Sequence, residues 1–91
     1  MLIQIAGITG MLGSAVSEAA RRRKHAVTTT ADITKAHAGD IVAPVVINCA
    51  GLVKQRAYPA SAFMLTNAVG PHKLAEACDA AGARFIHVST D

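Results

Sequence analysis

The chain has 91 residues, of which 52% are hydrophobic and 16% are charged, and its formal net charge is +3. This composition excludes a disordered polypeptide and predicts one small domain over residues 1–91. The excess positive charge comes from residues 21–24, at the expected end of a helix, where cations complement the helix dipole; a contact with an adenosine phosphate or another polyanion is the alternative. Because aromatic residues are sparse and no apolar stretch approaches the ~20 residues of a membrane span, we expect neither nucleic-acid nor membrane binding.

The chain opens with an apolar run that leads into three glycines. Residues 2–6 suit a buried parallel strand, and a helix is expected to begin near Met11. Gly7 allows a tight turn, Gly10 places no side chain between backbone and ligand, and Gly13 lets the helix lie close to the strand. Free amides at the start of the helix then predict a pyrophosphate site. A glycine-rich turn that binds no ligand is the alternative.

The helix after the glycines is expected to cover the sheet with one apolar face, formed by Leu12, Ala15, Val16, Ala19 and Ala20. Residues 25–30 are rich in β-branched side chains and predict a second strand beside the first. Asp32 follows at about 20 residues beyond the glycines, where dinucleotide folds often bind the ribose 2′-hydroxyl, but it suits the N-cap of a short turn equally well. Since the strand before it ends in threonines rather than an acid, the choice between NAD and NADP stays open.

Residues 35–43 are too few for a full crossover helix, so they predict one or two helical turns or a loop. A third strand is expected at residues 45–48, and small residues follow it at 49–51. Asn48 and this small-residue exit would let a cofactor pass closely over the end of the strand. A turn that needs small residues for steric reasons alone is the alternative.

Residues 59–81 follow a helical pattern that Gly70 and Pro71 should kink or divide, and Gly82 is expected to end the helix. Residues 84–88 then predict a fourth strand. This alternation of strands and helices predicts an α/β fold with a parallel sheet in the order second, first, third, fourth, and with helices on both faces.

The two cysteines, Cys49 and Cys78, lie too far apart in sequence for a metal cluster or a redox pair, and they predict free thiols in a reducing cytoplasm. The four histidines lack the spacing of metal ligands, so we predict no metal site. His87 suits a core or sheet position better than a ligand position. Because the chain begins directly with a core strand, we expect no signal peptide.

Four segments, residues 7–13, 45–51, 66–70 and 85–91, together resemble an extended short-chain dehydrogenase/reductase with a Rossmann fold. More narrowly, the chain resembles the amino-terminal half of the dTDP-4-dehydrorhamnose reductase group of sugar-nucleotide reductases and their epimerase relatives. The segments occur in the order of the family, on the elements that the hydrophobic pattern predicts.

This resemblance implies that the chain binds NAD(P), with a sugar nucleotide as the substrate. The implied cofactor-binding residues are Gly7, Thr9, Gly10, Met11, Leu12, Gly13, Asp32, Ile33, Asn48, Cys49, Ala50, Gly51 and Asn67. Thr90 matches the catalytic hydroxyl of the family, which hydrogen-bonds the sugar while a tyrosine transfers a proton and a lysine lowers the pKa of that tyrosine.

The family's Tyr-x-x-x-Lys pair follows the strand that ends in Ser-Thr-Asp, and the present sequence stops at Asp91. Tyr58 does not substitute for it, because the residue four positions later is Ala62. We therefore expect an incomplete Rossmann domain with little or no turnover by itself. Two hypotheses follow: the chain is the dinucleotide-binding portion of a sugar-nucleotide oxidoreductase, or it is a catalytically silent domain used for binding or assembly. We also expect a homo-oligomer, because residues 85–88 would form an apolar, unpaired sheet edge.

Overall fold

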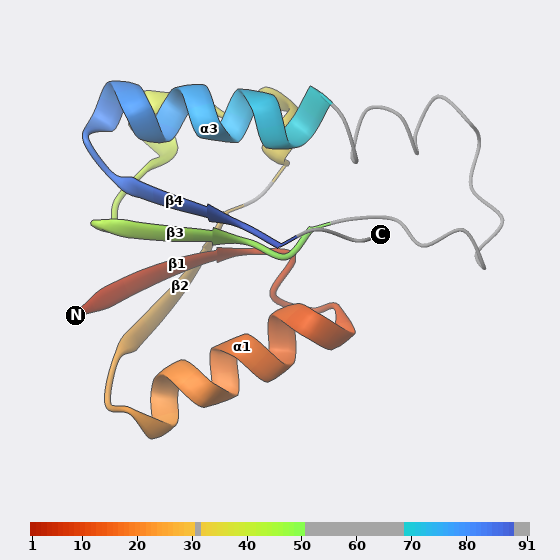
Figure 1. Cartoon of the computed structure of the whole chain (residues 1–91), viewed down its shortest axis with the longest axis vertical. Helices are drawn as coiled ribbons and strands as arrows, with labels where there is room; N and C mark the ends of the chain where they lie inside the picture. The colour runs from red at the N-terminus through yellow and green to blue at the C-terminus, as the bar shows by residue number, and fades with distance from the viewer. Residues whose placement is uncertain (31, 51–68, 89–91) are drawn as a thin grey trace, which may run out of the picture.

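The computed structural model describes residues 1–30, 32–50 and 69–88. Its elements are β1 (Leu2–Ala6), α1 (Met11–Arg22), β2 (Ala26–Thr30), the 3-10 turns η1 (Ile33–Lys35) and η2 (Ala38–Asp40), β3 (Val45–Asn48), α3 (Gly70–Ala81) and β4 (Arg84–His87). All strand pairs are parallel, and the order across the sheet is β2-β1-β3-β4 (Figure 1). The predicted α/β fold and strand order are confirmed.

The sheet is covered on both faces, with α1 on one side and α3 on the other (Figure 1). Successive side chains of β1 point to opposite faces of the sheet, so the core has one part under α1 and another under α3. Ile3 and Ile5 pack with Ala20 of α1, whereas Ala6 packs with Val46 and with the inner face of α3. Buried apolar residues on both faces of the central strand are typical of a parallel sheet between helices.

The contact face of α1 agrees only in part with the predicted one, since Ala20 is buried and Val16 packs beside it. The residues of α1 that the structure buries are Gly13, Ser17 and Ala20, while Ala15 and Ala19 are exposed and Leu12 is 41% exposed. Gly13 lies on this contact face because it packs directly against the turn, where a Cβ would overlap the Gly7 carbonyl oxygen. Backbone contact thus adds a small residue to the face that hydropathy predicts.

The carboxyl end of α3 follows the prediction, since Gly82 ends the helix with a left-handed φ of 74° and its N–H bonds to the carbonyls of the last turn. The helix begins at Gly70 with Pro71 in its first turn. The part of the predicted helix over 59–68 lies outside the described residues. Among the residues described, no helix is both long enough and apolar enough to cross a membrane.

Candidate functional site

The turn between β1 and α1 depends on two glycines for its geometry. Gly7 has a φ of +77°, and a Cβ added there would lie 2.7 Å from both the Cα and the nitrogen of Ala50. A Cβ added at Gly13 would overlap the carbonyl oxygen of Gly7. The N–H of Gly10 donates to that same carbonyl oxygen at 3.1 Å. No larger residue fits at Gly7 or Gly13 without movement of the backbone.

The first amides of α1 point out of this turn without a partner in the helix. Ser14 is the first residue of α1 whose N–H bonds within the helix, to the Gly10 carbonyl at 2.9 Å, and no side chain caps the helix. The amides of Met11, Leu12 and Gly13 come before it, at the positive end of the helix dipole. Met11 is 93% exposed and Leu12 is 41% exposed, whereas Gly13 is buried. Such a helix start attracts a phosphate group.

A cavity of about 430 Å³, here called the glycine-turn cavity, opens beside the turn. Its walls come from the ends of β1 and β2, from η1 and from the exit of β3. The lining residues are Gly7, Ile8, Thr9, Thr29, Thr30, Asp32, Ile33, Thr34 and Ala50. This is the carboxyl edge of the parallel sheet, where ligands of open α/β sheets bind.

Asp32 lies at the rim of the glycine-turn cavity and caps η1. Its Oδ1 accepts hydrogen bonds from the Thr34 N–H at 3.0 Å and from the Thr34 hydroxyl at 2.6 Å. These two bonds, with a smaller contribution from the Lys35 ammonium, lower the pKa of the Asp32 carboxyl. The N-cap prediction is confirmed, and the second carboxylate oxygen is not used in this turn.

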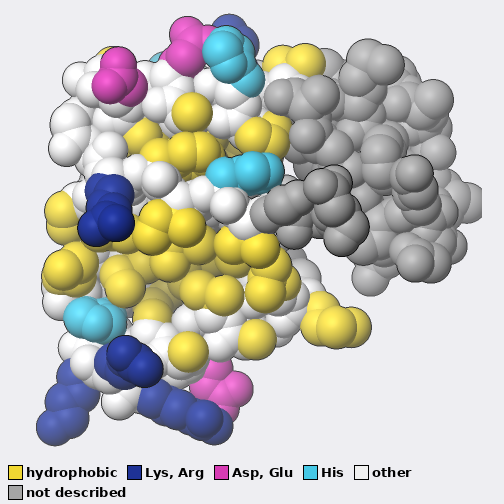
Figure 2. Space-filling view, viewed as in Figure 1, with side chains coloured by type: hydrophobic (Ala, Val, Ile, Leu, Met, Phe, Trp, Pro, Cys, Tyr) yellow, Lys and Arg dark blue, Asp and Glu magenta, His cyan; other side chains and the backbone are white. Residues whose placement is uncertain are grey.

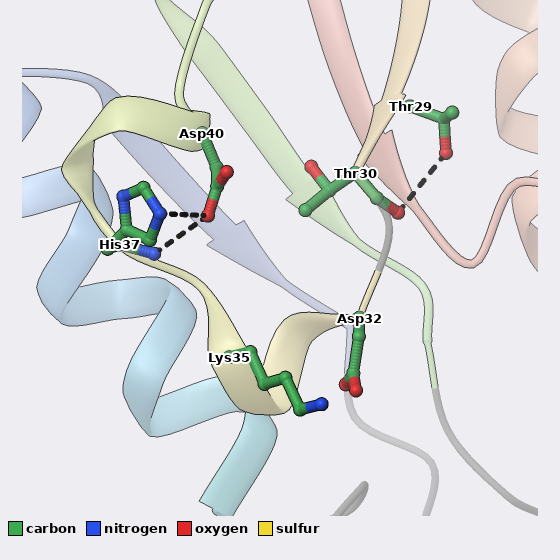
Figure 3. A pocket seen from close by; sticks show the side chains of 6 residues that line it. All are labelled: Thr29, Thr30, Asp32, Lys35, His37 and Asp40. Carbon is green, nitrogen blue, oxygen red and sulfur yellow. Dashed lines mark hydrogen bonds and ion pairs between the residues drawn. The ribbon is translucent and has the colours of Figure 1, made fainter.

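A second cavity of about 320 Å³, here called the polar cavity, adjoins the first and shares Thr29, Thr30 and Asp32 with it (Figure 3). Lys35, His37 and Asp40 complete its lining. Figure 3 shows the Lys35 side chain extending toward Asp32 on one side of the cavity, with His37 and Asp40 together on the other.

The His37 ring lies beside Asp40 in the polar cavity. Its Nδ1 accepts a hydrogen bond from the Gly39 N–H at 3.2 Å. Its Nε2 lies 3.5 Å from Oδ2 of Asp40, which also accepts from the His37 backbone N–H at 3.0 Å. The side chains of Asp32 and Asp40 thus bring two carboxyl groups to the polar cavity, and Lys35 brings one ammonium group.

Gln4, in the middle of β1 and 1% exposed, hydrogen-bonds to Thr30 and Asp40, which line the polar cavity. Its Nε2 donates to the Thr30 hydroxyl at 2.6 Å and to the Asp40 carbonyl at 2.8 Å, while its Oε1 accepts from the Val42 N–H at 3.0 Å. One buried amide thus ties the end of β2 to the segment after η2. A buried polar group is stable only when it is paired in this way.

The exit of β3 is held by Asn48, which is fully buried. Its Oδ1 accepts from the Ala50 N–H at 3.0 Å, and its Nδ2 lies 3.1 Å from Nδ1 of His87 on β4. Cys49 lies between Asn48 and Ala50 in the chain and packs on the α1 side of the sheet. Burial raises the pKa of its thiol. Among Asn48, Cys49 and Ala50, it is Ala50 that lines the glycine-turn cavity.

The structure brings five of the predicted cofactor-binding residues into one cavity wall: Gly7, Thr9, Asp32, Ile33 and Ala50. Gly10, Met11 and Leu12 lie at the adjacent helix start, whereas Gly13 and Asn48 are buried behind the wall. Gly51, Asn67 and Thr90 lie outside the described residues. Within residues 1–30, 32–50 and 69–88, no three His, Cys, Asp or Glu side chains are grouped as metal ligands would be.

The lining residues that were absent from the predicted set are Ile8, Thr29, Thr30 and Thr34. For Thr29 and Thr30 the sequence carries a signal, because they end the strand beside β1, and the ends of neighbouring parallel strands meet at one edge. For Thr34 the signal is its position within the turn that Asp32 caps.

The sequence is similar to a known protein family and to known reductases. The family model described as the RmlD substrate binding domain matches residues 1–91. A dTDP-4-dehydrorhamnose reductase from Mycobacterium tuberculosis (strain CDC 1551 / Oshkosh) is 40% identical over 97 residues, which cover 96% of this chain and 32% of the reductase. The chain thus spans about a third of the length of that relative.

Solved structures agree with the observed fold. A dTDP-4-dehydrorhamnose reductase from Clostridium acetobutylicum superposes with a TM-score of 0.77 at 30% identity, covering 93% of this chain and 34% of that one. A short-chain dehydrogenase/reductase superfamily protein from Agrobacterium tumefaciens, solved with bound NAD, has a TM-score of 0.82 at 20% identity and covers 98% of this chain and 32% of its own. The second likeness shows the fold alone.

Proposed function

Because the chain belongs to the RmlD substrate binding domain family, we propose that residues 1–91 form the NAD(P)-binding portion of a sugar-nucleotide oxidoreductase related to dTDP-4-dehydrorhamnose reductase. The observation that carries this proposal is the turn at Gly7, where the protein has no room for a Cβ at Gly7 or Gly13 and where the amides of Met11 and Leu12 have no hydrogen-bond partner among the described residues. A turn built so tightly beside an open cavity suits the close approach of a pyrophosphate.

Each part of the proposed site has a separate task. The amides of Met11 and Leu12 bind the pyrophosphate, Gly13 lets α1 lie against the turn, and Ala50 bounds the groove in which the dinucleotide lies. Asp32 and Ile33 contact the adenosine end. The bound dinucleotide would supply or accept a hydride.

Turnover needs further groups. Proton transfer to or from the sugar requires a positioned acid or base, and Thr90 supplies a hydroxyl alone. The sequence contains one tyrosine, Tyr58, without a lysine four residues later. We therefore propose that the 91-residue polypeptide binds the dinucleotide and does not oxidise it in the presence of a dTDP-4-keto sugar. The free thiols of Cys49 and Cys78 favour a reducing cytoplasmic location.

The charges beside the glycine-turn cavity favour NADH over NADPH. A 2′-phosphate near Asp32 would enter a region with two carboxylates and one ammonium, whereas a 2′-hydroxyl can donate to the unused carboxylate oxygen of Asp32. At a separation of about 4 Å in water, one unit charge pair changes an affinity by about fivefold. We expect a preference of this size.

Titration of the polypeptide with NADH and with NADPH, followed by the fluorescence of the reduced nicotinamide, tests both statements. We expect both to bind, NADH about fivefold more tightly, and the Asp32→Asn variant to bind the two about equally. Asparagine keeps the acceptor for Thr34, so η1 remains capped. Failure of both dinucleotides to bind would refute the proposed function, while equal affinities in the unaltered protein would refute only the preference.

The second hypothesis, a silent assembly module, draws on the exposed edge of the sheet. In the described part of the chain β4 pairs with β3 alone, and Ile86 on this edge strand is 40% exposed. Figure 2 shows hydrophobic side chains gathered between α3 and α1, where Figure 1 places the sheet. Such an edge promotes pairing with a second copy.

We therefore expect the 91-residue polypeptide to dimerise at tens of micromolar, a concentration typical of weak dimers. Sedimentation equilibrium measures the mass directly, and Ile86→Lys should shift the polypeptide toward monomer because it places a charge on the apolar edge. As a control, Val42→Lys introduces the same charge at a 63% exposed position that does not belong to the edge strand. A stable monomer at these concentrations would refute the assembly hypothesis and leave dinucleotide binding untouched.

A further inference from the structure

A line of contacts runs from the edge strand into the glycine turn. Asn48 and His87 are paired partners on β3 and β4, and their side chains meet at 3.1 Å. The other end of the Asn48 amide holds the Ala50 N–H. Ala50 in turn lies against Gly7, since its Cα and nitrogen are the atoms that a Cβ at Gly7 would meet first.

The hydrogen-bond chemistry fixes the direction of each bond in this line. The Ala50 N–H can only donate, so the atom facing it is the Asn48 Oδ1. The opposite atom, Nδ2, can then only donate, so the His87 Nδ1 must accept with its lone pair. This arrangement requires the tautomer with its proton on Nε2. If Nδ1 carried the proton, two donors would face each other and the amide would lose its orientation.

The His87 ring is positioned by stacking on a neighbouring aromatic ring. It stacks on Phe85, with ring centroids 6.3 Å apart and an interplanar angle of 16°. Phe85 itself packs against the core on the α3 side of the sheet. The His87 side chain is exposed, and among the described residues it contacts Asn48 by its Nδ1 and Phe85 by its ring.

We infer that His87 is a positioning residue for the dinucleotide site: its Nδ1, acting as a hydrogen-bond acceptor, orients the Asn48 amide, which sets the Ala50 backbone against Gly7 and so fixes one wall of the glycine-turn cavity. This inference rests on the proposed function, because it assigns His87 an effect on dinucleotide affinity. His87 touches no ligand itself and acts through two residues.

Two substitutions at position 87 separate this role from ring packing. His87→Phe keeps an aromatic ring beside Phe85 and removes the acceptor, whereas His87→Asn removes the ring and returns an acceptor oxygen near the position of Nδ1. We expect His87→Phe to weaken NADH binding about fivefold, the size of one hydrogen bond, and His87→Asn to restore most of the affinity. The matched control is His72→Phe, an exposed histidine on α3 paired with Glu76.

The tautomer gives a readout that a merely structural residue would not share. In the unaltered protein, nitrogen NMR of His87 in mildly alkaline buffer should report a proton on Nε2 and a free lone pair on Nδ1. A proton on Nδ1, wild-type affinity in His87→Phe, or the same weak affinity in His87→Asn would each overturn the inference. Absence of NADH binding by the unaltered protein would instead refute the proposed function, and the tautomer would still be measurable.

Discussion

Replacing Gly13 with alanine is expected to lower the free energy of unfolding by about 3 kcal/mol or more, the upper range for overpacking a tight contact. In an ordinary helix this change stabilises by about 1 kcal/mol, because alanine has the higher helix propensity. Here the sign reverses, since the new Cβ would overlap the Gly7 carbonyl oxygen. That oxygen belongs to backbone and also accepts from Gly10, so α1 must move away from the sheet.

Urea unfolding measures this loss as a lower midpoint. Gly82→Ala is the matched control, because a Cβ there meets nothing within 4 Å and the change tests only the left-handed φ of 74°. That strain costs about 1–2 kcal/mol. A Gly13→Ala variant as stable as Gly82→Ala would show that α1 does not depend on its contact with the turn.

The helices and strands were predictable because each depends on the hydrophobic periodicity and the glycine positions of its own segment. Residues 45–48 form a strand with the predicted bounds, and Gly82 ends α3 as expected. The predicted second strand began at His25, one residue before the observed Ala26, and the fourth was expected to include Val88, one residue beyond its observed end. Pairing with a neighbour, rather than composition, decides where a strand ends.

The polar contacts of the site were not predictable in the same way. Gln4 lies in an apolar strand, and its partners Thr30, Asp40 and Val42 are 26, 36 and 38 residues away. Their meeting depends on the parallel order of the strands and on the path of the segment after η2. The contact of Asn48 with a residue 39 positions later has the same origin. Sequence patterns locate the strand ends, while the three-dimensional pairing decides which side chains face the ligand and which support it.

Gly10→Ala is expected to have the opposite effect from Gly13→Ala: dinucleotide affinity falls while the fold persists. A Cβ at Gly10 would lie 3.5 Å from the Gly7 carbonyl oxygen, an ordinary contact, and the φ of −74° suits alanine. The loss of a favourable N-cap lowers stability by only about 0.5–1 kcal/mol. The methyl group would, however, stand beside the free amides of α1, where the pyrophosphate is proposed to bind.

We expect NADH affinity to fall about tenfold or more, equivalent to about 1.4 kcal/mol or more of binding free energy. Fluorescence titration measures this change, and urea unfolding of the same variant shows whether the protein is intact. Gly82→Ala again serves as the control, since it alters a glycine far from the turn in sequence and should leave affinity unchanged. Unchanged affinity in a folded Gly10→Ala protein would mean that the ligand does not approach the start of α1, and the glycines would then serve the packing of helix on strand alone.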